Sequence, residues 1–180
     1  SAHWMQESRY RLALSNVLMA ALDINRFDAF EEDLKKIKDL PLRSENDHVE
    51  FFQNVQFIEL LYSVNTGKLD RARKMIGMIQ KGLDEFEEQM THARFLSFLH
   101  NIAAAFLVLE EHETAAQYVY QIEKRKRWKS RRDVIEFAPF FRLMLDYTRY
   151  EPDQVYAQAK KVERKWNEKK AKSDGPEISQ

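Results

Sequence analysis

The feature that most constrains this chain is an apolar pattern that recurs at a nearly constant step. Segments with apolar residues at their first, fifth and eighth positions start at Phe30, Ala72, Ala115 and Val155, so the steps are 42, 43 and 40 residues. Apolar residues spaced by three and four line one face of an α-helix. Self-similarity at a fixed period is typical of repeat architectures. The pattern therefore predicts a stack of similar helical units.

A second helical segment precedes each of these segments, so the helices come in pairs. Each preceding segment contains a doublet with at least one apolar residue, and an apolar residue follows the doublet three residues later. The doublets are Val17-Leu18, Ile58-Glu59, Ile102-Ala103 and Phe141-Arg142. We predict an all-α domain of about four antiparallel helix pairs over residues 1–172. Residues 173–180 are predicted to be a coil tail, because Gly and Pro within them stop a helix.

Individual helices differ in how clearly the pattern defines them. In the first helix, Val17 and Leu18 are both expected on one apolar face. The fourth helix either ends at Gly82 or continues to Met90, and the sequence leaves both open. Pro139 lies inside the seventh predicted helix, where it leaves the Ile135 carbonyl without its helical donor and is expected to kink the helix.

Composition agrees with this fold class and narrows the class of function. Four Gly and four Pro in 180 residues are few for a turn-rich β-sandwich or barrel. With 32% charged and 44% hydrophobic residues, the chain does not have the composition of a disordered protein. No apolar run of about 18 residues occurs, so we expect no membrane-spanning helix and no membrane partner. The absence of cysteine fits a cytoplasmic protein.

Two connections between helices resemble the inter-helix turn of the tetratricopeptide-repeat family. They are residues 65–72, Asn-Thr-Gly-Lys-Leu-Asp-Arg-Ala, and residues 110–115, Glu-Glu-His-Glu-Thr-Ala. The resemblance covers essentially the whole chain, with a step of about 40–43 residues against the usual 34 of the family. Glu59 and Arg142 stand where the family normally has small residues. The resemblance implies a right-handed α-solenoid of about four antiparallel helix pairs.

The same resemblance predicts a function in binding. A solenoid of helix pairs presents a concave surface and has no pre-built catalytic pocket, and in this family the first helix of each pair lines that surface. The matching positions are Ser15, Met19, Gln53, Gln56, Leu60, Ser97, His100, Ala104, Pro139 and Leu143. We expect a non-enzymatic interaction or scaffold module that binds a peptide or partner helix there. The alternative is an ordinary solvated face.

A basic segment follows the sixth predicted helix. Seven of its nine residues are Lys or Arg and one is aromatic. Its members are Lys124, Arg125, Lys126, Arg127, Trp128, Lys129, Arg131 and Arg132. Basic residues stabilise the C-terminal end of a helix without any ligand, which is the simpler interpretation. The alternative is a regulatory protein that binds nucleic acid through this segment.

No residue pattern supports catalysis or a metal ion. His92 and His100 are eight residues apart, so on one helix they lie about 12 Å apart along the axis, too far to share an ion. The carboxylates of residues 31–33 and of residues 84–88 are consecutive, so they point in different directions around a helix. No glycine-rich phosphate loop occurs. We therefore expect no enzymatic activity, no metal and no cofactor.

Overall fold

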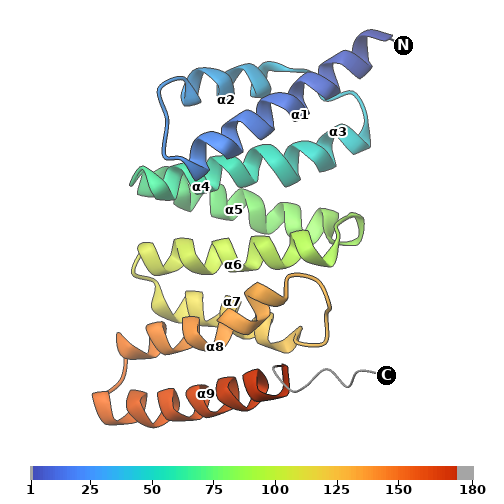
Figure 1. Cartoon of the computed structure of the whole chain (residues 1–180). Helices are drawn as coiled ribbons and strands as arrows, with labels where there is room; N and C mark the ends of the chain where they lie inside the picture. The colour runs from blue at the N-terminus through green and yellow to red at the C-terminus, as the bar shows by residue number, and fades with distance from the viewer. Residues whose placement is uncertain (1, 174–180) are drawn as a thin grey trace, which may run out of the picture. The chain divides into compact units, whose positions relative to one another are not determined.

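The computed structural model describes the backbone of residues 2–173 and the side chains of residues 6–170. The described backbone is all-α and contains no β-strand, which confirms the all-α part of the predicted fold class (Figure 1). Seven residues of the predicted coil tail, 174–180, lie outside the described residues. None of the described helices is both long enough and apolar enough to cross a membrane.

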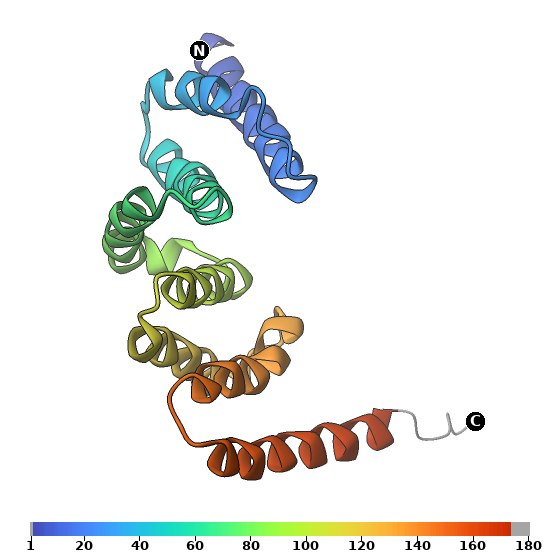
Figure 2. The same cartoon turned by 90° about the vertical axis from the view of Figure 1, so that its left-hand side faces the viewer.

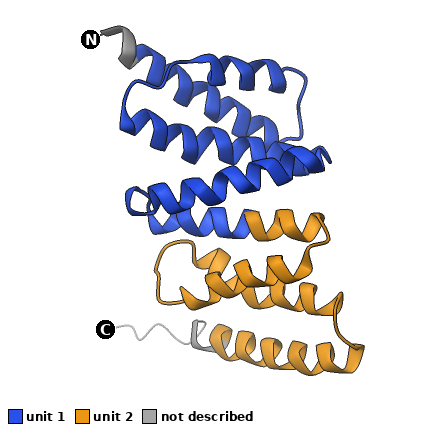
Figure 3. Cartoon of the chain, turned by 180° about the vertical axis from the view of Figure 1, so that it is seen from behind, with its two compact units in different colours: residues 1–101 blue, residues 102–180 orange. Residues whose placement is uncertain are grey.

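The chain divides into two compact units, residues 1–101 and residues 102–180, and each is described by itself (Figure 3). The boundary falls inside helix α6 (His92–Val108). The first unit also contains α1 (Ala2–Asp23), α2 (Phe30–Asp39), α3 (Glu45–Glu50), the π-helical turn η1 (Phe51–Gln56), α4 (Phe57–Asn65), α5 (Leu69–Phe86) and the 3-10 turn η2 (Glu87–Gln89). The second unit also contains α7 (His112–Lys124), α8 (Arg132–Tyr147) and α9 (Pro152–Ser173).

The core of the first unit forms between α1, α2 and α4. The predicted stripe of α2, Phe30, Leu34 and Ile37, is fully buried there, so this part of the pattern is confirmed. In α1 the prediction is wrong for one residue of the doublet, because Leu18 is 1% exposed but Val17 is 55% exposed. Neighbouring residues lie 100° apart around a helix, and here the core covers only one of the two.

Helices α3 and α4 are joined by the π-helical turn η1 into one continuous rod. Ser44 begins the rod with a capping box, in which its hydroxyl accepts a hydrogen bond from the Asp47 amide and Asp47 accepts one from the Ser44 amide. Within η1 the backbone leaves carbonyl oxygens available. Arg94 of α6 donates hydrogen bonds to the Gln53 carbonyl and, at 2.7 Å, to the Asn54 side chain.

Helix α5 runs past Gly82 and ends at Phe86, so it neither ends at Gly82 nor continues to Met90, which were the two alternatives that the sequence left open. Gly82 is buried and lies against the ring of Phe52. A Cβ atom at this position would lie only 2.3 Å from Cε2 of that ring. The glycine is therefore present for close packing between α5 and η1 rather than for a helix end.

The repeat in the sequence is also a repeat of backbone geometry. Asn25, Gly67 and Glu110 all have a left-handed backbone, with φ of 51°, 69° and 61°. In each case the amide of the next residue donates to the carbonyl five residues before it, at 2.9, 2.8 and 2.9 Å. This is the Schellman arrangement that ends a helix. The three turns are 42 and 43 residues apart, which matches the step of the apolar pattern.

The second unit is built around α8, which packs against α7 on one side and α9 on the other (Figures 1 and 2). The predicted stripe of α7, Ala115, Val119 and Ile122, is fully buried. On α8 the buried face includes Phe141 and Leu145, and the helix continues through Pro139. In α9, Val155, Ala159 and Val162 are only half-buried, and Tyr156 and Trp166 are exposed.

Candidate functional site

A groove in the second unit is bordered by α8 and α9 and has a volume of about 370 Å³. This is within the usual size of ligand pockets, about 300–1,000 Å³. All the residues that line it belong to the second unit. It has an apolar floor and a charged rim.

The floor is made of apolar side chains from both helices. Helix α8 contributes Pro139, Phe140 and Leu143, and α9 contributes Val162 and Trp166. The rings of Phe140 and Trp166 meet edge to face, with centroids 5.5 Å apart and planes at 81°. Trp166 remains 44% exposed. A half-exposed tryptophan over an apolar floor is a typical anchor point for a binding partner.

Pro139 interrupts the backbone hydrogen bonds of α8 beside the groove. Because proline has no amide hydrogen, the carbonyl of Ile135 lacks the donor that an uninterrupted α-helix would supply. Both residues line the groove.

The rim carries six basic side chains and two acidic ones. The acidic ones are paired: Glu123 accepts hydrogen bonds from Arg142 at 2.9 and 3.1 Å, and Glu136 pairs with Lys169 and Arg132. The hydrogen bond from Lys169 lowers the pKa of Glu136, and Arg132 adds to this effect. Both pairs tie neighbouring helices together.

Three basic side chains remain on the rim after these pairs are formed. Lys126, Lys161 and Lys165 have no ion-pair partner among the described side chains. Lys161 and Lys165 are four residues apart on α9, so they lie on the same side of the helix, about 6 Å apart along its axis. The groove consequently has an excess of positive charge beside an apolar floor.

The turn before α8 places the end of the basic segment at the groove. Arg131 has a left-handed backbone, φ 49°, and its carbonyl accepts hydrogen bonds from the amides of Val134 and Ile135. Its guanidinium holds Asp133 at 2.8–3.1 Å, and these hydrogen bonds lower the pKa of Asp133. This ion pair stabilises the first turn of α8, from which Arg132 reaches the rim.

The structure brings together two groups of residues that the sequence predicted separately. Pro139 and Leu143, predicted as partner-binding positions, line the same groove as Lys126 and Arg132 of the basic segment. The other members of the basic segment do not line it. Among them, Arg125 lies over the ring of Trp128, 5.4 Å from its centroid, and Trp128 is half-buried.

Three predicted partner-binding residues are core residues instead. Leu60 is 0% exposed, and Ser15 and Ser97 are also closed to solvent, so these predictions are wrong. Leu60 follows the π-helical turn η1. Residues 57–60 of α4 are all buried, so this part of the helix has no solvated face. Ser97 is on the buried side of α6, where its hydroxyl donates to the Ala93 carbonyl at 2.9 Å.

The remaining predicted positions are half-buried. Met19, Gln53, Gln56 and His100 belong to the first unit and do not line the groove. The Gln56 amide oxygen is buried without a hydrogen-bond partner among the described residues. Ala104 is half-buried in the second unit.

The residues that sequence reasoning missed are those of α9. Lys161, Lys165 and Lys169 are spaced by four residues, and Val162 and Trp166 follow them at the same spacing. A stripe of lysines beside an apolar stripe was therefore visible in the sequence. Nothing in the sequence distinguished it, because α9 contains several other basic residues on its remaining faces.

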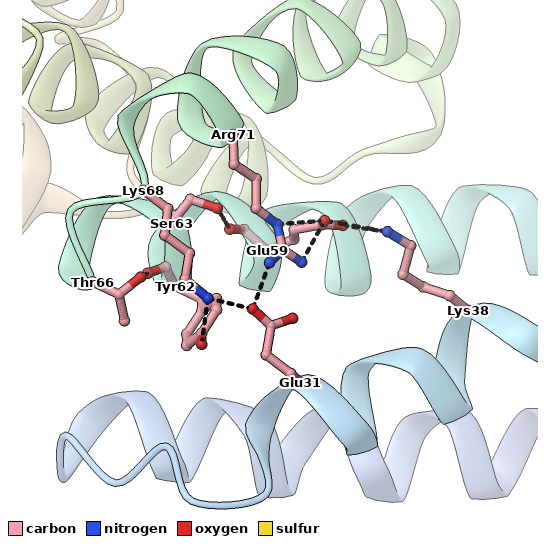
Figure 4. A network of polar contacts seen from close by, with 8 residues as sticks. All are labelled: Glu31, Lys38, Glu59, Tyr62, Ser63, Thr66, Lys68 and Arg71. Carbon is pink, nitrogen blue, oxygen red and sulfur yellow. Dashed lines mark hydrogen bonds and ion pairs between the residues drawn. The ribbon is translucent and has the colours of Figure 1, made fainter.

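A second polar cluster lies in the first unit, where α2, α4 and α5 meet (Figure 4). Arg71 donates to Glu59 at 2.8 and 3.0 Å and to Glu31 at 2.7 Å. Lys38 donates to the other side of Glu59, at 3.0 and 3.2 Å, and Lys68 pairs with Glu31 and with the Tyr62 hydroxyl. Each charge in the cluster thus has a partner of opposite sign.

Charge pairing in this cluster lowers the pKa of Glu31. Burial alone would raise this pKa, but the hydrogen bonds from Lys68 and Arg71 outweigh the effect of burial. Glu59 is buried between Lys38 and Arg71. The ion pairs of the cluster therefore connect three helices.

No metal site is apparent among the described side chains, since no three His, Asp or Glu residues gather in a way that could hold an ion. The described residues thus define an all-α protein of paired helices with a basic, apolar-floored groove. Comparisons of the chain with protein-family models, with curated proteins and with solved structures find no match.

Proposed function

We propose that this protein is an interaction module that binds an acidic, amphipathic peptide or partner helix in the groove of α8 and α9. The observation that carries the proposal is the combination of an apolar floor with the unpaired lysines Lys126, Lys161 and Lys165. An apolar ligand alone would not need the lysines. A purely ionic ligand would not need Phe140 and Trp166.

A helical ligand fits the spacing of the rim. Lys161 and Lys165 are one helical turn apart, and acidic residues at positions i and i+4 of a partner helix have the same separation. Apolar residues on the adjoining face of that helix would contact the floor, as in other complexes in which an amphipathic helix lies in a groove.

The repeat geometry supports the same class of protein. Three Schellman turns at the repeat step, each joining two helices, are what a tetratricopeptide-like repeat requires. We propose that the helix pairs are repeat units of a right-handed α-solenoid. In such proteins the stacked helices serve as a scaffold for binding.

Binding to designed peptides tests this proposal directly. A fluorescent amphipathic peptide with Glu at i and i+4 and Leu on the adjoining face is titrated by anisotropy, beside a peptide in which Lys replaces each Glu. We expect the acidic peptide to bind and the basic one not to bind. Lys161→Glu with Lys165→Glu should abolish binding, and Phe140→Ala should weaken it by on the order of 2 kcal/mol, as for a central apolar anchor.

The matched control is Lys160→Glu with Arg164→Glu. These residues are on the same helix, and the double variant changes the net charge equally, but neither residue lines the groove. Equal losses in both double variants would show a nonspecific charge effect and contradict the proposal. Tighter binding of single-stranded RNA than of the acidic peptide, with a steep loss at higher salt, would favour the nucleic-acid alternative.

A further inference from the structure

Helix α1 carries a second apolar face besides the one in the core. Its buried residues, from Arg11 to Leu22, lie on one side of the helix. At 100° per residue, another apolar stripe lies about 150° away around the axis. The members of this stripe are Tyr10, Ala13, Val17, Ala20 and Ile24, and all are exposed.

The stripe has the spacing of a coiled-coil seam. Its members are alternately three and four residues apart, which is the heptad repeat of positions a and d. Tyr10, Val17 and Ile24 are 49%, 55% and 63% exposed. Single exposed apolar residues are common, but a continuous stripe marks an interaction surface. A helix that packs along this stripe would cover it.

We propose that the covering helix is α1 of a second copy of the chain, packed antiparallel across a two-fold axis. Along the stripe the large residues occupy the a positions, and the small residues Ala13 and Ala20 occupy the d positions. An antiparallel pair brings a positions of one helix opposite d positions of the other. Val17 then lies opposite Ala13 of the second copy, and Tyr10 lies opposite Ala20 of the second copy.

This orientation gives even packing from Tyr10 to Ala20. Each small residue meets a large one, so the two helix axes can keep a constant distance. A parallel pair would place Val17 against Val17 and Ala13 against Ala13, with crowding at one level and a gap at the next. Gaps and overpacking are both destabilising. The alternation of large and small residues therefore favours the antiparallel pair.

Charge beside the seam favours the same orientation. Arg9, Asn16 and Asp23 each precede a large seam residue by one position, so they line one edge of the stripe. In an antiparallel pair this edge meets itself. Arg9 of one copy then lies beside Asp23 of the second copy, and Asn16 meets its own counterpart. In a parallel pair the same edge would face Leu14 and Ala21, which carry no charge.

The interface would be small, because one pair of helices buries less than a standard protein–protein interface. We therefore expect a weak dimer whose population rises with concentration between about 1 µM and about 1 mM. Sedimentation velocity over this range measures it. Val17→Glu places a charge in the seam and is expected to weaken self-association at least about tenfold.

Leu12→Glu is the matched control for this substitution. Leu12 is 51% exposed on the same helix but lies about 120° from the centre of the seam. It should leave the dimer unchanged. Both residues are exposed, so thermal unfolding at low concentration should confirm that both variants are folded. A dimer weakened equally by both substitutions would overturn the proposal.

A separate experiment tests whether the two α1 helices pack antiparallel. Arg9→Asp and Asp23→Arg should each weaken the dimer, and the double variant should restore it, because the swapped pair is complementary only in the antiparallel arrangement. The chain has no cysteine, so Asn16→Cys adds a single thiol near the two-fold axis. A short bismaleimide should cross-link this variant and not Leu12→Cys. A strictly monomeric protein at all concentrations, or a charge swap without rescue, would overturn the proposal.

Discussion

The packing of Gly82 against Phe52 gives the sharpest test of the structure, because α5 contains a matched position. Gly77 is in the same helix, and a Cβ atom there would meet no atom within 4 Å. At Gly82 a Cβ atom would lie 2.3 and 2.5 Å from two carbons of the Phe52 ring. Replacing either glycine by Ala makes the same chemical change in the same helix.

The expected effects have opposite signs. Ala is favoured over Gly inside a helix by about 1 kcal/mol, so Gly77→Ala should stabilise the protein by about that amount. Gly82→Ala gains the same helix propensity but overpacks the core, at a cost of about 1–3 kcal/mol. The ring cannot move aside easily, since Phe52 is 1% exposed and stacks on Phe98 with centroids 4.9 Å apart. The upper end of the range is therefore expected.

Urea denaturation followed by far-UV circular dichroism measures both variants. The difference in unfolding free energy between Gly77→Ala and Gly82→Ala isolates the packing cost, because the propensity gain cancels. We expect a difference of about 1–3 kcal/mol. Combining Gly82→Ala with Phe52→Leu should recover part of the loss, by coupling between residues in contact. Equal stabilities for the two single variants would refute the described contact between α5 and η1.

Three further predictions concern stability. Arg11 is buried in a 3.0 Å ion pair with Asp47. Arg11→Met leaves this buried carboxylate without its ion-pair partner, so it should lower the unfolding free energy in urea by about 3–5 kcal/mol. Arg26→Met removes an exposed ion pair and should change the unfolding free energy by no more than about 0.5 kcal/mol. The pKa of Asp47 is below its ordinary 3.8, because hydrogen bonds from the Arg43 amide, Ser44 and Arg11 outweigh the effect of burial. As the pH drops, the unfolded state therefore binds the proton at a higher pH than the folded state. The unfolding free energy should fall as the pH drops from about 5 through the pKa of folded Asp47. Unfolding curves of Asp47→Asn should lack this part of the pH dependence. Ala72 is fully enclosed, so Ala72→Leu should overpack the α4–α5 pair and lower the urea midpoint, at a cost of about 1–3 kcal/mol.

The helices were predictable because burial imposes a period on the sequence. Phe30, Leu34 and Ile37 are buried as expected, and the equivalent stripe of α7 is buried as well. The turns between helices were predictable in position but not in detail. Gly67 is a favourable residue for a left-handed backbone, whereas Glu110 takes the same conformation without any such preference. The position of this turn in the structural repeat, and not the residue type, accounts for the left-handed backbone of Glu110.

The groove was predictable only in parts. Pro139 and the basic segment were both noticed, for unrelated reasons, and only the packing of α8 on α7 and α9 brings them to one place. Long-range contacts of this kind leave no local pattern. Leu60 was misplaced because residues 57–60 of α4 are buried on all sides of the helix. Apolar periodicity assumes one solvated face, and this part of α4 has none.

The register of α1 shows a further limit of reasoning from apolar periodicity. Periodicity locates the buried face of a helix only when the opposite face is polar. In α1 the core stripe contains Arg11 and Ser15, while the outer stripe contains Tyr10, Val17 and Ile24. The outer face is therefore at least as apolar as the inner one, and residue type alone assigns Val17 to the core. Only the contacts of α1 with α2 and α4 show which face is inside. The fold leaves this outer apolar face of α1 exposed, and the self-association that we propose through α1 would bury it.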